Sequence, residues 1–127
     1  MAPNTVHRVT RLGLAFVFAW HGLVPKLLCR HPDEVAMLHD AGVPADLSEL
    51  ILTLFSITEL ALALCLLLFW HRRWPPLICL VAMGLATVGV IVTSPRFVTA
   101  AFNPVSLNLA VACLAIIDLL TLSSREK

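Results

Sequence analysis

The sequence has little charge: charged residues make up 13% of its 127 residues, about half of the roughly 25% found in ordinary soluble domains. Tyrosine is absent, whereas apolar residues reach 59% and the mean hydropathy is +0.90. One small core cannot bury so large an apolar share, which excludes a soluble monomer. We therefore expect a single membrane domain that covers residues 1–127, with no second folded unit.

The sequence also lacks the motifs of most cofactor and metal sites. It contains no C-x-x-C, no C-x-x-C-H, no G-x-G-x-x-G and no haem-type histidine pair across its apolar runs. A site built from His31, His39 and nearby acids is the alternative, although two histidines eight residues apart match no tight zinc spacing. We expect no metal and no evident cofactor, and the sequence identifies no catalytic motif, which leaves catalytic residues undefined and favours a protein that is not itself an enzyme. The net charge of +1 gives no extended basic field, so nucleic acid is not an expected partner.

Four apolar runs, each long enough to span a bilayer at about 20 residues, lie at 9–28, 47–70, 76–93 and 104–122. The first lacks an A-x-A-like cleavage site, so it is interpreted as a span and not as a signal peptide. Asp46 and Glu49 have the spacing of a capping box, which predicts the start of the second span. The predicted fold is an all-α polytopic membrane protein, a four-transmembrane-helix bundle.

The longest loop, at 30–45, predicts a short interfacial helix. Pro32 suits a helix start, Asp33 and Glu34 suit its first turn, and Gly42 suits its end. A solvated cap on the bundle is the simplest interpretation of this segment.

Lysine and arginine near the span ends predict the orientation. Six lie on one side (Arg8, Arg11, Arg72, Arg73, Arg125 and Lys127) and three on the other (Lys26, Arg30 and Arg96). The positive-inside rule therefore predicts cytoplasmic termini, in a bacterial inner membrane. Trp70 and Trp74 match an aromatic belt at the inner interface.

Ionisable residues inside the spans are the candidate site, because each costs about 2.5–3.5 kcal/mol at mid-helix and is usually paired or functional. His21 and Glu59 each lie about 11 residues from the inner end of a span, roughly 16 Å deep, and form the natural pair. Lys26 is expected to snorkel or to join them. Arg11 and Asp118, near the cytoplasmic interface, predict a structural ion pair.

Small and hydrogen-bonding residues at spacings of three or four predict helix contacts in the last three spans. They are Glu49, Thr53, Ser56, Glu59 and Ala63; Ala82, Ala86, Gly89 and Thr93; and Asn108, Ala112, Ala115 and Asp118. An internal repeat of two helical hairpins is a further hypothesis. It would make Glu59 and Asn108 equivalent positions facing a common centre, and Asn108 joins the candidate polar site.

Ordered motifs that begin at Arg11, His31, Thr58 and Phe102 together resemble the DoxX-like family of four-helix membrane proteins. The positions that match the family pattern are Arg11, His21, Gly22, Pro25, Lys26, Glu59, Asn103, Pro104 and Asn108. The resemblance implies a link to membrane redox assemblies, including a thiosulfate:quinone oxidoreductase, and to NAD(P)-binding oxidoreductase domains. It assigns no catalytic role to these positions.

Three hypotheses of function follow. The first is an accessory or anchoring subunit of a membrane oxidoreductase, with a pocket for a quinone or lipid between the helices. The second is a small proton-linked transporter or channel that uses Glu59 and needs a homo-oligomer, since four helices are few for a carrier. The third is a scaffold whose polar residues only hold the bundle together.

Overall fold

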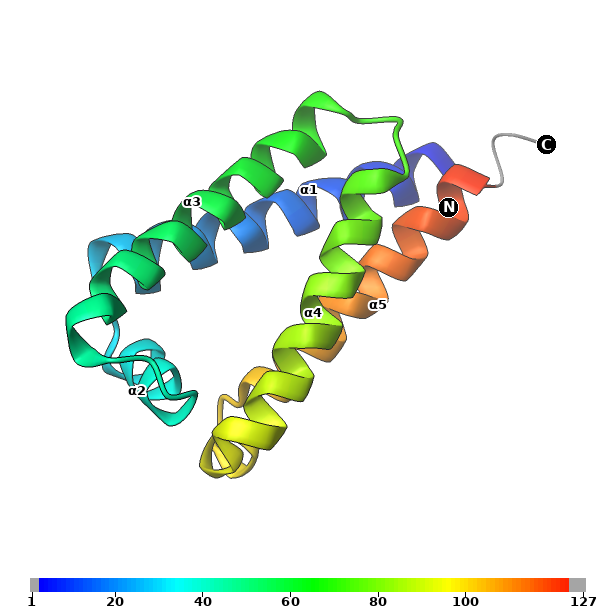
Figure 1. Ribbon diagram of the computed structural model, residues 1–127. Coiled ribbons are helices and arrows are strands. Elements are labelled where there is room, and N and C mark those ends of the chain that lie inside the picture. Colours follow the sequence, from blue (N-terminus) through cyan, green and yellow to red (C-terminus); the bar gives the residue numbers. More distant parts are fainter. Residues whose placement is uncertain (1–2, 124–127) are drawn as a thin grey trace.

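The computed structural model describes residues 3–123 as helices joined by short loops (Figure 1). The elements are α1 (Pro3–His21), the π-helix η1 (Gly22–Leu28), α2 (Pro32–Asp40), α3 (Ala45–Leu68), α4 (Trp74–Thr93), the 3-10 helix η2 (Pro95–Thr99) and α5 (Pro104–Ser123). Four segments of the described chain are long and apolar enough to cross a membrane: Asn4–Leu28, Ala45–Leu68, Trp74–Thr93 and Pro104–Ser123. The all-α fold with four spans and a short helix in the first loop is therefore confirmed.

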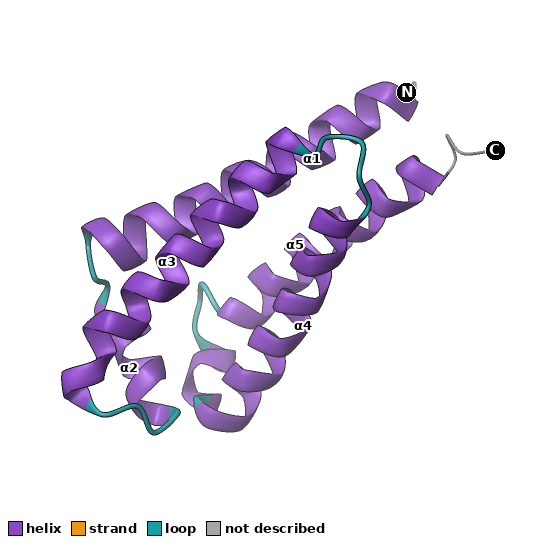
Figure 2. Cartoon of the chain, turned by 45° about the horizontal axis from the view of Figure 1, so that its top comes forward, coloured by secondary structure: helices purple, strands orange, loops and turns teal. Residues whose placement is uncertain are grey.

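The long helices form two pairs that meet at one end and separate toward the other. α1 lies along α3, and α4 lies along α5, as both ribbon views show (Figures 1 and 2). α1 also packs against α5 at the convergent end, where α1 begins and α5 ends (Figure 1). At the divergent end α2 reaches η2, where Asp40 Oδ2 lies 2.8 Å from Arg96 Nη2. The two pairs are thus joined at both ends.

The buried apolar core draws on all four long helices. It consists of Leu14, Ala15 and Phe18 from α1, Leu62, Ala63 and Leu66 from α3, Cys79 from α4, and Val111 and Ala115 from α5. The outward faces remain apolar as well: Phe16, Leu85 and Val92 are strongly exposed. Such a surface suits contact with lipid chains, since burial inside the molecule does not account for its hydrophobicity.

Two helix starts differ from those predicted. α1 begins at Pro3 and not near residue 9, because its polar residues His7, Thr10 and Arg11 are buried against partners and extend the helix beyond the apolar run. The prediction that Asp46 and Glu49 form a capping box is wrong. The helix α3 begins at Ala45 after an extended Pro44, and no side chain caps it. Ser48 Oγ instead donates a hydrogen bond back to the carbonyl oxygen of Pro44 at 3.2 Å.

The small-residue pattern of α4 does not mark a packed helix contact. A Cβ added to Gly89 would meet nothing within 4 Å, and Ala82 and Ala86 line a cavity. By contrast, Ser56 and Ala63 on α3 and Ala115 on α5 are buried. Of the cationic residues used to predict orientation, Arg125 and Lys127 lie outside the described residues.

Candidate functional site

A cavity of about 500 Å³ lies between the α1–α3 pair and the α4–α5 pair. Most of its wall is made of apolar side chains from every long helix. Its polar residues are His21, Lys26, Glu34, Thr58, Glu59 and Asn108. An apolar cavity of this size with a few convergent polar groups has the usual properties of a small-molecule site. It can take a ligand with an apolar body and a polar head.

Lys26 holds the polar part of the cavity together. Its Nζ lies 3.0 Å from Glu59 Oε1 and 3.3 Å from Glu34 Oε1, so one ammonium group contacts carboxylates from both α3 and α2. Lys26 is 7% exposed, and it therefore does not snorkel to the interface. Three charged groups from three elements form what we call the Lys26 cluster: Lys26, Glu34 and Glu59.

The π-helix η1 carries Lys26 to this position. Pro25 has no N–H to donate to the carbonyl oxygen of His21, so a regular α-helix cannot continue through it. The wider turn that results places Lys26 in the cavity wall, and the N–H of Cys29 closes it on the carbonyl oxygen of Val24 at 2.9 Å. π-Turns of this kind are often found at functional sites.

Gly22 allows η1 and α3 to approach closely. A Cβ at Gly22 would lie 2.9 Å from the carbonyl oxygen of Ser56 and 3.2 Å from Glu59 Cβ, so only glycine fits here. Ser56 Oγ donates a hydrogen bond of 2.6 Å to the carbonyl oxygen of Gly22. This backbone contact places Glu59 beside η1, within reach of Lys26.

Glu59 does not have the partner that the sequence predicted. The cation at its carboxylate is Lys26 and not His21, although His21 lines the same cavity. Glu59 Oε2 is buried and has no hydrogen-bond partner among the described residues. Asn108 lines the cavity from α5, so the two positions that the repeat hypothesis equates both face it.

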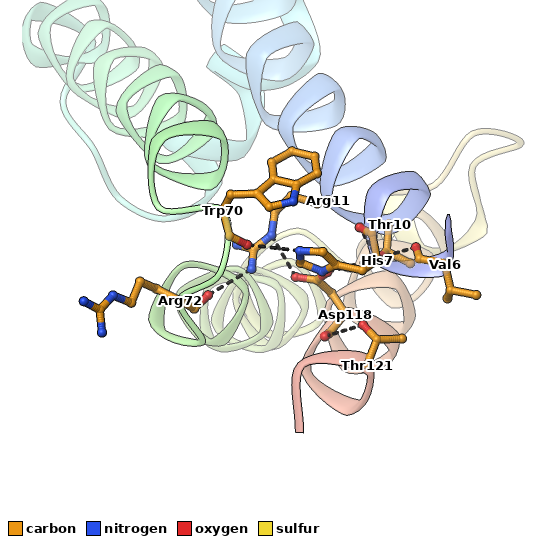
Figure 3. A network of polar contacts seen from close by, with 8 residues as sticks. All are labelled: Val6, His7, Thr10, Arg11, Trp70, Arg72, Asp118 and Thr121. Atoms are coloured by element: carbon orange, nitrogen blue, oxygen red, sulfur yellow. Dashed lines mark hydrogen bonds and ion pairs between the residues drawn. The ribbon is translucent and has the colours of Figure 1, made fainter. Parts of the chain in front are cut away.

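A second polar group lies at the convergent end, and Figure 3 shows its contacts from close by. Asp118 of α5 contacts three residues of α1: its Oδ1 lies 2.7 Å from His7 Nδ1 and 3.0 Å from Thr10 Oγ1, and its Oδ2 lies 3.1 Å from Arg11 Nε. His7, Arg11 and Asp118 are all fully buried. The structure thus brings together the predicted Arg11–Asp118 pair, with His7 and Thr10 as additional partners.

Two backbone carbonyl groups from the α3–α4 loop complete this group. We call it the polar junction: His7, Thr10, Arg11 and Asp118, with the carbonyl groups of Trp70 and Arg72. His7 Nε2 donates to the carbonyl oxygen of Trp70 at 3.1 Å, and Arg11 Nη2 donates to that of Arg72 at 2.9 Å (Figure 3). Sequence reasoning missed His7 because it precedes the first apolar run. Its spacing of four from Arg11 on one helix face is the signal that could have found it. The junction ties α1, α5 and the loop before α4 together.

No cluster of three or more metal-binding side chains occurs within residues 3–123. His31 Nδ1 accepts a hydrogen bond from the backbone N–H of Asp33 and lies in the cap of α2.

A sequence model described as the DoxX-like family matches residues 15–116. The match covers the spans Ala45–Leu68 and Trp74–Thr93 in full, the first and last spans in part, and all of the Lys26 cluster and the cavity wall. Comparison with curated proteins and with solved structures finds no match.

Proposed function

The chain belongs to the DoxX-like family, and from this premise we propose that it is an accessory membrane subunit of an oxidoreductase system that holds a quinone or a similar amphipathic lipid between its helix pairs. The chain is an integral membrane protein of that family. We place it in a bacterial inner membrane, with both termini in the cytoplasm.

The cavity between the two helix pairs is the observation that carries this proposal. Apolar side chains make up most of its wall, and the Lys26 cluster and His21 contribute polar groups to it. An isoprenoid or acyl chain suits the apolar part, while a ring oxygen or head group suits the ammonium of Lys26. Chemistry on such a ligand would fall to a partner subunit, because this chain supplies no cofactor motif.

Gentle solubilisation followed by mass spectrometry tests the proposal. We expect a quinone or lipid, together with an oxidoreductase subunit, to copurify with the wild-type chain. Ala86→Phe, which fills the cavity wall, should lose the small molecule. Val88→Phe is the matched control, because Val88 lies two residues away on α4, is exposed and does not line the cavity. Equal ligand content in the two variants would rule out the cavity as the binding site.

Proton-linked transport is the second candidate, and the unpartnered Oε2 of Glu59 favours it. A carboxylate facing a cavity within a membrane span is a typical proton-binding group in transporters. Proteoliposomes that contain the chain would then show a proton or solute flux that Glu59→Gln abolishes. A flux unchanged by this substitution, or no flux at all, removes this candidate.

A further inference from the structure

We infer that the cavity takes lipids whose polar head is uncharged, such as a quinone, a quinol or a lipid alcohol, and excludes lipids whose head is anionic, such as a fatty acid or an anionic phospholipid. This inference rests on the proposed function and specifies the class of head group that the same cavity binds.

The charges in the cavity wall leave no cation over for an anionic head. Within residues 3–123 the ionisable side chains of the wall are His21, Lys26, Glu34 and Glu59. The ammonium of Lys26 contacts both carboxyl groups, at 3.3 Å and 3.0 Å. Glu34 alone balances its charge when Glu59 carries a proton, and the two carboxylates outweigh it when Glu59 is ionised. Histidine is largely uncharged near pH 8, so the wall has no net positive charge there in either case.

An anionic head would therefore be buried without a counter-charge of its own. A charged group that leaves water for an apolar environment loses far more solvation free energy than a neutral polar group, unless it is paired. Lys26 is the one cation that could pair with it, and the anion would then lie beside the carboxyl groups that Lys26 already contacts. Repulsion between like charges opposes that arrangement.

A neutral head has suitable partners in Asn108 and His21. The amide of Asn108 makes no hydrogen bond to any of residues 3–123, and the residue is half-buried in the cavity wall, with its amide atoms accessible. An amide offers two donors and an acceptor, and a neutral imidazole offers one of each. These groups can bind a carbonyl or hydroxyl oxygen without any charge on the ligand. The wall thus matches an uncharged, hydrogen-bonding head.

Two probes that differ in charge test this inference. Decanesulfonamide and decanesulfonate have the same chain and heads of similar size, but only the sulfonate is charged near pH 8. Titration measures their binding to the wild-type chain in phosphatidylcholine nanodiscs, corrected for partitioning into empty nanodiscs. We expect the sulfonamide to bind at least about tenfold more tightly, because the sulfonate would be buried without a free cation. Equal binding, or tighter binding of the sulfonate, would overturn the inference.

Substitution of Glu34 tests whether the charge of the Lys26 cluster sets this preference. Glu34→Gln makes the cluster more positive by one charge in either form of Glu59, so the preference for the sulfonamide should fall by at least about threefold. Asp33→Asn is the matched control: Asp33 is the neighbouring acid on α2, is exposed and does not line the cavity. It should keep the wild-type preference. An unchanged preference in Glu34→Gln contradicts the charge argument.

Substitution of Asn108 tests the neutral partner. Asn108→Leu keeps the approximate size of the side chain and removes its hydrogen-bonding groups, so decanesulfonamide should bind at least about fivefold more weakly, while circular dichroism shows an intact fold. Ser106→Ala is the control on the same helix, because Ser106 is exposed and does not line the cavity. Equal affinities of these two variants would contradict a role of Asn108 in binding the head.

Competition against decanesulfonamide distinguishes the kinds of neutral head. Stronger competition by decylbenzoquinone than by decanol supports a quinone, and the reverse supports a lipid alcohol; both results support an uncharged head. If an amphipathic ligand copurifies with the chain but the sulfonate binds as tightly as the sulfonamide, the inference alone fails. If no ligand copurifies and neither probe binds, the ligand-binding part of the proposed function fails with it.

Discussion

Arg11 and Asp118 place opposite charges inside the same helix interface, with both side chains fully buried. Burying charges is costly, and two contacts offset part of that cost: Arg11 Nε lies 3.1 Å from Asp118 Oδ2, and Arg11 Nη2 donates a hydrogen bond to the carbonyl oxygen of Arg72. His7 and Thr10 contact the second carboxylate oxygen. At the residue scale, the junction thus depends on Asp118, which contacts three α1 side chains.

Asp118→Asn should therefore destabilise the protein by about 3–5 kcal/mol, because it leaves the guanidinium of Arg11 buried without a counter-charge. Thermal unfolding in detergent, followed by circular dichroism, measures the change. Asp46→Asn removes a carboxylate that is exposed at the start of α3 and should have little effect. An Asp118→Asn protein that is as stable as the Asp46→Asn control would show that the ion pair contributes nothing.

At the scale of the element, η1 is the segment that adds a charged side chain, Lys26, to the wall of an otherwise mostly apolar cavity. Gly22 brings its backbone against α3, and Pro25 causes the wider turn that carries Lys26 into the cavity wall. These two residues precede Lys26 by four and one positions. Their effects are separable, since one controls the distance between helices and the other controls the register within one helix.

Gly22→Ala is expected to destabilise the protein by about 1–3 kcal/mol, because its methyl group would lie 2.9 Å from the backbone oxygen of Ser56. Gly84→Ala is the control: a Cβ there meets nothing within 4 Å, so the change should be neutral or stabilise α4 by about 0.5–1 kcal/mol. Chemical or thermal unfolding compares the two. Equal effects of both substitutions would contradict the close approach of η1 and α3.

Pro25→Ala restores a backbone N–H and allows η1 to become a regular α-helix. A regular α-turn in place of the π-turn changes the position of Lys26 around the helix axis relative to Gly22, and so changes its distance from Glu59. We expect the copurifying quinone or lipid to be reduced by at least about tenfold while the helical signal is kept, as mass spectrometry and circular dichroism would show. Pro95→Ala, in the exposed part of η2, should keep the ligand content of the wild type. Unchanged binding by Pro25→Ala would mean that η1 does not position Lys26.

At the scale of the whole molecule, the polar junction and the cavity occupy different regions between the α1–α3 pair and the α4–α5 pair. The junction fastens the pairs where they converge, and the cavity lies between the pairs, with Glu34 of α2 in its wall. The Asp40–Arg96 pair then joins α2 to η2 at the divergent end. Exposed ion pairs of this kind contribute about 0–1 kcal/mol, so this end is the less firmly held one and is where a ligand is expected to enter.

Orientation in the membrane is a second property of the whole molecule. Arg11 and Lys26 are buried in ion pairs, so neither is a free flanking charge. Without them, five lysine and arginine residues flank the predicted cytoplasmic side and two flank the opposite side, so the predicted orientation is unchanged. Tags at either terminus should be accessible from the cytoplasm and protected in intact cells. Labelling of an N-terminal or C-terminal tag from the periplasm would contradict this prediction.

The positions of the four spans and of the interfacial helix could be predicted because long apolar runs and proline at helix starts are local signals. The partner of Glu59 could not be predicted from the sequence. Lys26 lies four residues after Gly22, on the part of the chain that approaches α3, but the sequence does not show that the turn at Pro25 is a π-turn or which helix it approaches. The start of α1 was missed for a similar reason, since His7 and Arg11 lack the hydropathy of a span and are buried only through contacts with α5 and the α3–α4 loop.

The sequence by itself determined that this protein is an all-α membrane domain of the DoxX-like family, with its rare ionisable residues inside the spans. Hydropathy and motif order are properties of neighbouring residues, so they can be read along the chain. Only the tertiary structure decided that Lys26 lies between Glu34 and Glu59, that His7 and Thr10 join Arg11 at Asp118, and that a cavity lies between the helix pairs. These features depend on how helices approach and rotate against one another, which spacing along the chain does not specify.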